Sequence, residues 1–231
     1  MRAEGADKLE VLYRLLCHIG ESPALVFCNH REAVDRISVL LIEMGIAHGV
    51  FHGGMEQEER ERELIKFRNG SHRLLITTDL ASRGLDIPEI EHVIHYQLPP
   101  DEKAFVHRNG RTARMKAEGT SWLVMAEEER LPAYLPEAPA LEELPQTLPP
   151  PPKPQWATLY IGAGKKDKVN KIDVVGLLLQ KGGLQKEELG LIEVLDKSAF
   201  AAVKRQKAPA VVERLRWEKI KTKKVKIAIS K

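Results

Sequence analysis

The first 130 residues alternate between short apolar runs and segments in which apolar residues recur at helical spacing. Runs rich in branched side chains predict strands at 24–28, 47–51, 74–77, 92–96 and 121–125. Helical spacing appears at 33–44 and again around 64–67, after a charged stretch at 56–63. Continuous apolar strands separated by helices favour an α/β fold. We expect a mostly parallel sheet covered on both faces, with ligand sites at the carboxyl ends of its strands.

From residue 158 the pattern changes to six short elements. It predicts strand 158–161, helix 169–181, strands 189–195 and 199–203, helix 208–217 and strand 224–229. The order β-α-β-β-α-β matches the ferredoxin-like plan that RRM domains share. We expect Tyr160 to be a core or sheet-face residue, and Trp217, at the end of the second helix, to be a core residue.

A proline-rich segment separates the two patterns. Residues 131–154 hold nine of the fourteen prolines, a density that favours an extended polyproline-II chain over packing. We therefore expect a first domain at 1–130, a semi-rigid linker at 131–157 and a small second domain at 158–231.

Charge divides at the same linker. Residues 158–231 carry 18 Lys and Arg against 8 Asp and Glu, a net charge of +10, whereas residues 1–157 carry 18 against 25, a net charge of −7. The basic second domain is the expected nucleic-acid surface. The alternative is a lysine-rich face that serves only solubility.

Cysteine content and hydropathy indicate the compartment. The two cysteines show no C-x-x-C spacing, which fits a reducing cytoplasm. No apolar stretch approaches the roughly 20 residues of a membrane span, so we expect a cytoplasmic protein without a membrane partner. The spacing of the histidines suggests no metal site.

Two segments carry residues suited to phosphate. Residues 107–114, His-Arg-Asn-Gly-Arg-Thr-Ala-Arg, set three guanidinium groups and an imidazole around one glycine. Because arginine keeps its charge and forks onto phosphate oxygens, this pattern suits a polyphosphate. Residues 77–88, Thr-Thr-Asp-Leu-Ala-Ser-Arg-Gly-Leu-Asp-Ile-Pro, follow a predicted strand. There, hydroxyls and amides can meet phosphates, and Gly84 permits close approach of the backbone.

Together these segments resemble motifs V and VI of the second RecA-like domain of DEAD-box RNA helicases. Phe27 lies in a stretch similar to motif IV, and His52-Gly53-Gly54 resembles the turn after the next strand. Gln57 with Arg60 matches the family's Q-x-x-R. One departure is Ala113, which stands where the family commonly has glycine and lacks its dihedral freedom.

The resemblance implies ATP as the cofactor and assigns roles to residues. Arg111 and Arg114 would face the γ-phosphate, while His107 and Arg108 would link to the other core domain. Gly84 and Asp86 would contact the nucleotide, Asp86 through the ribose; the alternative for Asp86 is a cap ahead of Pro88. The backbone of single-stranded RNA would be held by loops that position it without reading sequence. These loops carry Gly53, Gly54, Gln57, Arg60, Thr78, Asp79 and Arg83.

Part of a complete helicase core is absent from the sequence. No G-x-x-x-x-G-K-[ST] phosphate loop occurs. The nearest look-alike ends in the Gly-Ala-Gly-Lys-Lys of 162–166, but Leu159 stands where the first glycine is required and Lys166 where Ser or Thr is required. Asp101-Glu102 follows two prolines and predicts the acidic first turn of a helix rather than a magnesium site. We expect a longer parent whose N-terminal core domain holds Mg²⁺, and no significant ATP hydrolysis by this chain alone.

The second domain has its own resemblance. Residues 159–168, Gly182-Gly183-Leu184 and 189–192 resemble the C-terminal RNA-binding domain of DbpA-like helicases. This implies a structured hairpin of large-subunit ribosomal RNA as the target. The candidate RNA contacts are basic: Lys165, Lys166, Lys168, Lys204, Arg205, Lys221, Lys223 and Lys224.

Two classes of function follow. The first is the C-terminal half of an ATP-dependent DEAD-box RNA helicase, with RNA and an N-terminal core domain as partners. The second is a non-catalytic RNA-binding or ribosome-assembly adaptor with a degenerate helicase domain. A DNA-directed helicase half is disfavoured by the appended domain.

Overall fold

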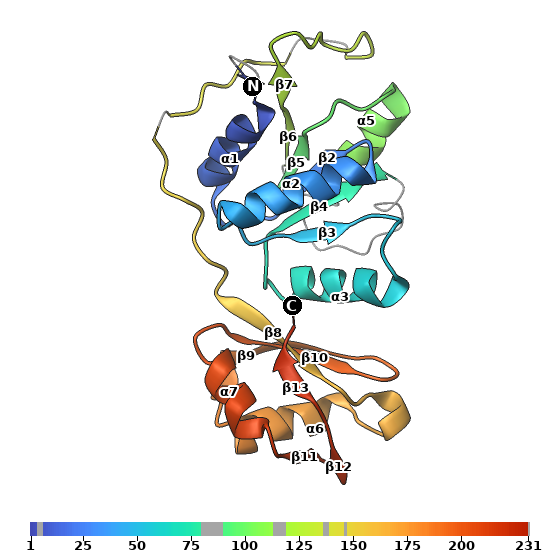
Figure 1. Cartoon of the computed structure of the whole chain (residues 1–231), viewed down its shortest axis with the longest axis vertical. Helices are drawn as coiled ribbons and strands as arrows, with labels where there is room; N and C mark the ends of the chain where they lie inside the picture. Colours follow the sequence, from blue (N-terminus) through green and yellow to red (C-terminus); the bar gives the residue numbers. More distant parts are fainter. Residues whose placement is uncertain (4–6, 80–89, 113–118, 136–138, 146, 231) are drawn as a thin grey trace. The chain divides into compact units, whose positions relative to one another are not determined.

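The computed structural model describes residues 1–3, 7–79, 90–112, 119–135, 139–145 and 147–230. The chain divides into two compact units (Figure 1). Unit 1 comprises Met1–Glu63 and Arg73–Lys153, and unit 2 comprises Leu64–His72 and Pro154–Lys231. The last turns of helix α3 (Gln57–Arg68) are therefore counted with unit 2.

Unit 1 is built on a parallel sheet of five strands in the order β3-β4-β2-β5-β6. The strands are β2 (Ala24–Cys28), β3 (Gly49–Phe51), β4 (Leu74–Thr78), β5 (His92–His95) and β6 (Thr120–Leu123). Every residue of β2 and β4 is buried, as central parallel strands require. The predicted α/β fold is confirmed. A further short parallel pair joins β1 (Arg2–Ala3) to β7 (Met125–Ala126).

Successive side chains of a strand point to opposite faces of the sheet, so the apolar strands contribute to a core on each face. Val26 and Cys28 of β2 join one apolar core with helices α1 (Lys8–Ile19) and α2 (Arg31–Glu43). On the other face Phe27 stacks on His95, whose ring in turn lies 5.3 Å from Phe105 of helix α5 (Glu102–Asn109). Both faces of the sheet are therefore covered.

Helix α1 was not among the predicted elements. Asp7 caps it by accepting a hydrogen bond from the Leu9 amide at 2.9 Å. Its buried residues Leu9, Leu12 and Leu16 recur at helical spacing. The signal was therefore present in the sequence as a capping aspartate followed by leucines three and four residues apart.

Helix α5 begins as the sequence predicts. Asp101 is its N-cap and accepts from the Ala104 amide at 2.7 Å, and Glu102 lies in the first turn. This acidic pair is accordingly a helix start.

The proline-rich segment packs against unit 1 at two points. Leu144 is buried in the core of unit 1, and its carbonyl accepts from Arg14 Nη2 at 2.5 Å. Tyr134 donates its hydroxyl to the Pro99 carbonyl at 2.6 Å, and its ring lies 5.8 Å from that of Phe105. The expectation of a linker without packing is wrong for these residues, because their apolar side chains find partners in unit 1.

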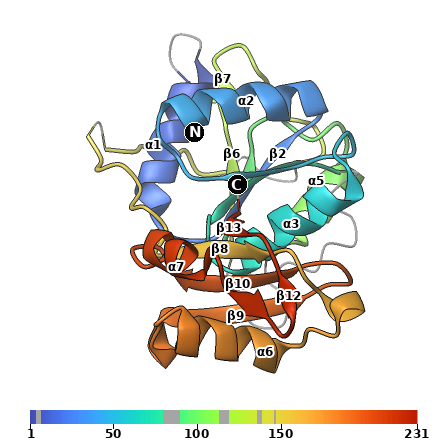
Figure 2. The ribbon, with the colours of Figure 1, turned by 60° about the horizontal axis from the view of Figure 1, so that its bottom comes forward.

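Unit 2 contains a four-stranded antiparallel sheet in the order β13-β8-β10-β9 (Figure 2). Its main elements are β8 (Trp156–Ile161), α6 (Lys171–Gly176), β9 (Leu189–Val194), β10 (Ala199–Lys204), α7 (Ala208–Leu215) and β13 (Ile227–Ile229). The predicted β-α-β-β-α-β order is present. The chain adds a π-helical turn (Leu177–Lys181), two 3-10 turns (Lys165–Asp167 and Lys186–Glu188) and the hairpin β11 (Lys219–Ile220) to β12 (Lys223–Lys224).

The core of unit 2 lies between its sheet and its two helices. Leu159 and Ile161 of β8 pack there with Val203 of β10, Leu178 and Leu215. Among the described residues, no helix is both long and apolar enough to traverse a bilayer.

Candidate nucleotide and RNA sites

Arg108 lies at the carboxyl edge of the sheet of unit 1 and is fully buried. Its guanidinium donates to both carboxylate oxygens of Asp79 at 2.7 Å, from Nε and Nη2. Nη2 also donates to Asn29 Oδ1 at 2.7 Å, and Nη1 to the Gln97 carbonyl at 2.8 Å. The Phe27 ring lies 5.2 Å from the guanidinium carbon. One side chain therefore ties together the ends of β2, β4 and β5.

This geometry corrects the role predicted for Arg108 and adds a structural role for Asp79. Arg108 was expected to link to another core domain, yet its donors are engaged within unit 1 and its side chain has no exposed surface. For Asp79, which was expected to contact RNA, both carboxylate oxygens accept from Arg108, and the RNA role stays a prediction. A buried guanidinium requires a paired carboxylate, so both residues position the surrounding loops. Sequence reasoning missed Asn29 and Gln97, although each follows a predicted strand.

His95 is a buried neutral group beside this network. Its Nε2 lies 2.9 Å from Asn109 Oδ1 and 3.1 Å from Ser121 Oγ. Burial lowers the pKa of His95 to about 4, because a charged imidazole is poorly solvated there; the nearby Arg108 charge adds to this effect. Asn109, the last residue of α5, is thereby fixed to strand β5.

Arg111, predicted to face the γ-phosphate, lies beside His107, predicted to link to another core domain. Arg111 Nη2 donates to His107 Nε2 at 2.9 Å, and both side chains are half-buried. The Arg111 amide donates to the Arg108 carbonyl at 3.1 Å, so the turn after α5 continues directly from the buried arginine. The structure thus places these two predicted residues together. Arg114 and Ala113 fall outside the described residues, as do Arg83, Gly84 and Asp86.

The predicted RNA loops lie at the same edge of the sheet. Gly53 and Gly54 are exposed, and the Gly54 amide donates to His52 Nδ1 at 3.2 Å. Because Nδ1 accepts, the opposite ring nitrogen of His52 donates to Asp35 at 3.0 Å, which orients the turn. Arg60 donates to Gln57 Oε1 at 2.7 Å, so the predicted pair is joined. Thr78 is buried at the end of β4.

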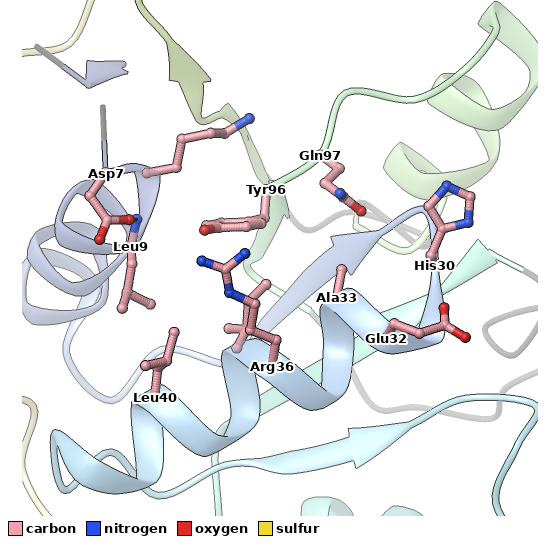
Figure 3. Close-up of a pocket in the computed structure, with 11 residues that line it drawn as sticks. Asp7, Leu9, His30, Glu32, Ala33, Arg36, Leu40, Tyr96 and Gln97 are labelled. Carbon is pink, nitrogen blue, oxygen red and sulfur yellow. Dashed lines mark hydrogen bonds between the residues drawn. The ribbon is translucent and has the colours of Figure 1, made fainter. Parts of the chain in front are cut away.

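A pocket of about 550 Å³ opens between the start of α1 and α2 (Figure 3). Tyr96 is at its centre, with the Arg36 side chain pointing toward the Tyr96 ring. Burial raises the pKa of Tyr96 to about 12, and Lys8 is paired with Glu129 at 2.7 Å. Of the arginines predicted to face the γ-phosphate, Arg111 is described and does not line this pocket, whereas Gln97, whose carbonyl accepts from Arg108, does.

In unit 2, the backbone amides of the look-alike phosphate loop donate to backbone carbonyls of another segment of the same unit. The amides of Lys165 and Lys166 donate to the carbonyls of Leu195 and Asp196 at 2.8 and 2.9 Å. A Cβ on Gly164 would lie 2.3 Å from the Leu195 carbonyl oxygen, which explains the glycine. With its amides engaged, this loop cannot cradle an anion through them, but Lys165, Lys166 and Lys168 are all exposed.

The remaining lysines predicted to contact RNA differ in whether a carboxylate or an aromatic ring already contacts them. Lys223 pairs with Asp167 at 2.6 Å and Lys221 with Asp173 at 3.1 Å. The Lys223 hydrogen bond lowers the pKa of Asp167. Lys166 lies 3.6 Å from Asp196 with both groups exposed, and Lys204 lies over the Trp156 ring. Lys224 lies over the ring of Trp217, at 4.0 Å from its centroid.

Two predictions for unit 2 are wrong. Arg205 is not a free RNA contact, because its guanidinium donates to the carbonyls of Pro154 at 2.5 Å and Trp156 at 2.8 Å. Burial also lowers the pKa of Arg205. Trp217 is not a core residue, since it is 69 % exposed. Tyr160, as expected, belongs to the sheet face, with its ring 5.6 Å from that of Phe200.

Comparison with known proteins explains both units. Residues 7–116 match the model of the helicase conserved C-terminal domain, and residues 158–229 match the model of the DbpA RNA binding domain. The chain joins a helicase C-terminal domain to a DbpA RNA-binding domain. The first match spans both phosphate-type segments, 77–88 and 107–114, and the second spans most of the basic stretch 158–231.

Curated relatives align with nearly the whole chain. It is 34 % identical over 230 residues to the ATP-dependent RNA helicase DbpA of Escherichia coli and 29 % identical over 254 residues to that of Bacillus subtilis. These alignments cover 97 % and 96 % of this chain but 50 % and 52 % of the relatives. The chain therefore spans about half the length of the curated helicases it matches.

Solved structures match the helicase C-terminal domain. The E. coli DEAD-box protein SrmB, crystallised with the regulator of ribonuclease activity RraA, is 33 % identical with a TM-score of 0.51, over 54 % of this chain and 74 % of that one. The yeast DEAD-box splicing factor Prp28 is 29 % identical with a TM-score of 0.51, over 56 % of this chain and 29 % of that one.

Proposed function

We propose that this chain acts as the C-terminal half of an ATP-dependent DEAD-box RNA helicase. In this proposal a partner N-terminal core domain presents ATP and holds its Mg²⁺, and unit 1 supplies arginines to the phosphates. Domain 1–130 closes on ATP and single-stranded RNA, segment 131–157 tethers, and domain 158–231 selects the RNA. Hairpins of large-subunit ribosomal RNA are the proposed targets, in the cytoplasm.

The observation that carries the proposal is the connection from buried Arg108 to half-buried Arg111. Arg108 is anchored by Asp79, Asn29 and Gln97, and the Arg111 amide bonds back to the Arg108 carbonyl. An arginine presented from such a fixed turn loses little freedom on meeting a phosphoryl group. Arginines in this role accelerate phosphoryl transfer by about 10³ to 10⁵.

A fusion protein tests the catalytic part. In the fusion, the N-terminal half of the B. subtilis DbpA relative is joined to this chain. The control protein joins the same N-terminal half, at the same junction, to the relative's own C-terminal half. We expect RNA-stimulated ATP hydrolysis by the fusion and none by this chain alone. A folded fusion that binds RNA without turnover, beside an active control, would favour the non-catalytic adaptor instead.

RNA binding is tested on the chain itself. The +10 charge of residues 158–231 predicts affinity for a ribosomal RNA hairpin that falls steeply with salt, because bound counterions are released. A DNA hairpin of the same sequence is the competitor. Equal affinity for both would remove the RNA selectivity from the proposal.

A further inference from the structure

Trp217 is an exposed aromatic ring in an otherwise polar neighbourhood. It is 69 % exposed, and every other Phe, Tyr and Trp among the described residues is buried or half-buried. Ala208, Val211 and Leu215 form the buried face of α7, and Trp217 follows two residues after the last of them. It therefore lies off the face that packs on the core, and its burial contributes little to folding.

The sheet of unit 2 offers no comparable ring. Thr158 and Phe200 are buried at 1 % and 3 % exposure, and Tyr160 is half-buried with its ring against Phe200. Trp156 of β8 is also half-buried, and Lys204 lies over its ring. Proteins that bind unpaired RNA rely on accessible aromatic faces on which bases stack. In unit 2 that property belongs to Trp217.

Cations surround this ring. The Lys224 ammonium lies 4.0 Å from the ring centroid and the Arg216 guanidinium carbon lies 5.4 Å from it. Lys219 is paired directly across the β11–β12 hairpin from Lys224, so both side chains leave the same face of that hairpin. Neither lysine makes an ion pair with a carboxylate among the described residues.

Two lysines opposite one another destabilise a strand pair, because like charges repel at this separation. The hairpin retains them, anchored by Ile220 and Val225, which are buried at 3 % and 7 % exposure. A bound polyanion would relieve the repulsion. The neighbouring cations Lys221 and Lys223 are instead neutralised by Asp173 and Asp167, so the unbalanced charge is concentrated beside Trp217.

We propose that Trp217 is a stacking platform for an unpaired base of bound RNA, with Lys219 and Lys224 holding the adjoining phosphates. The inference rests on RNA binding by unit 2 and adds the residue that contacts the base. RNA is the occupant because it carries a π-face and phosphates side by side. An apolar protein surface would have to bury the lysines beside Trp217 without compensation.

The test uses the full chain and two RNAs that share one stem. One RNA is a blunt hairpin, and the other adds a short unpaired flank. Affinities are measured by fluorescence anisotropy for wild type, Trp217→Ala, Trp217→Phe and Leu191→Ala, the last removing an exposed apolar side chain from β9. Circular dichroism checks that each variant is folded.

Trp217→Ala is expected to weaken binding of the flanked RNA by about 5- to 150-fold, the range for loss of one stacked base. Trp217→Phe and Leu191→Ala should retain most of the affinity, and blunt-hairpin binding should be unchanged. Intrinsic tryptophan emission should be quenched by the flanked RNA in wild type and much less in Trp217→Phe. If wild type and Trp217→Ala bind the flanked RNA with equal affinity and the RNA does not quench tryptophan emission, the proposal that Trp217 stacks on a base is wrong.

The charge component is measured separately. Lys219→Gln with Lys224→Gln should reduce the salt slope for the flanked RNA by about 1.4, or roughly 0.7 for each phosphate that is no longer neutralised. Lys197→Gln is the matched control, since Lys197 lies in the turn between β9 and β10. An unchanged slope in the double variant overturns the phosphate role. If wild type binds neither RNA, the proposed RNA-binding function fails rather than the platform.

Discussion

Asp79→Asn tests the buried network of unit 1 most directly. The substitution keeps the size of the side chain but removes the charge that neutralises Arg108, which has no exposed surface. The guanidinium would retain its bonds to Asn29 and the Gln97 carbonyl, while its two bonds of 2.7 Å to the carboxylate would be replaced by at most one bond to the neutral amide oxygen. Breaking a buried ion pair by removing one partner costs about 3–5 kcal/mol.

Arg108→Met is the informative comparison. It removes the buried charge and leaves a flexible apolar side chain, while the Asp79 carboxylate, 21 % exposed, remains partly hydrated. We therefore expect a smaller loss than in Asp79→Asn, and partial recovery when Asp79→Asn and Arg108→Met are combined. The pair constitutes a double-mutant cycle in which the interaction energy is isolated.

The assay is urea unfolding followed by the fluorescence of Trp122, which belongs to unit 1. Trp156→Phe and Trp217→Phe are introduced into all variants so that unit 2 contributes no signal. With a slope of about 2 kcal/mol per molar urea, a loss of 3–5 kcal/mol moves the midpoint by roughly 2 M. A midpoint for Asp79→Asn within about 0.3 M of wild type, or above that of Arg108→Met, would refute the reasoning.

Three further outcomes are expected. The pKa of His95 in the folded protein, about 4, lies below its unfolded value of about 6.5, so stability falls as pH drops from about 6.5 toward 4. Between pH 7 and 5 the loss is about 2 kcal/mol; His95→Gln should lack this component in urea unfolding, and an identical pH dependence would contradict it. Asp101→Ala removes the cap of α5 and should lower the unfolding free energy by about 1 kcal/mol, measured against Glu102→Ala as the control. In the active fusion, Arg111→Ala should lower turnover by about 10³-fold or more with RNA binding retained; comparable turnover would remove Arg111 from the site.

The sequence predicted those features whose causes are local. Strands β2 and β4 follow from continuous apolar runs, and the start of α5 follows from Asp101. Arg108 was misassigned because its burial depends on Asp79, which is 29 residues away in sequence and paired only after the sheet forms. Trp217 was misassigned because α7 ends at Leu215, earlier than the pattern indicates, so helical periodicity no longer governs the direction of the indole.

Packing of Leu144 shortens the stretch of the proline-rich segment that is not held to unit 1. Arg14 also donates to the Pro145 carbonyl at 3.1 Å, so the chain is held to unit 1 as far as Pro145, ahead of Pro154, where the second stretch of unit 2 begins. Nine residues of fully extended chain span at most about 30 Å, compared with roughly 80 Å for the whole segment 131–154. Leu144→Ser would remove this apolar anchor and so lengthen the stretch of chain that is not held to unit 1, without changing any residue predicted to contact ATP or RNA.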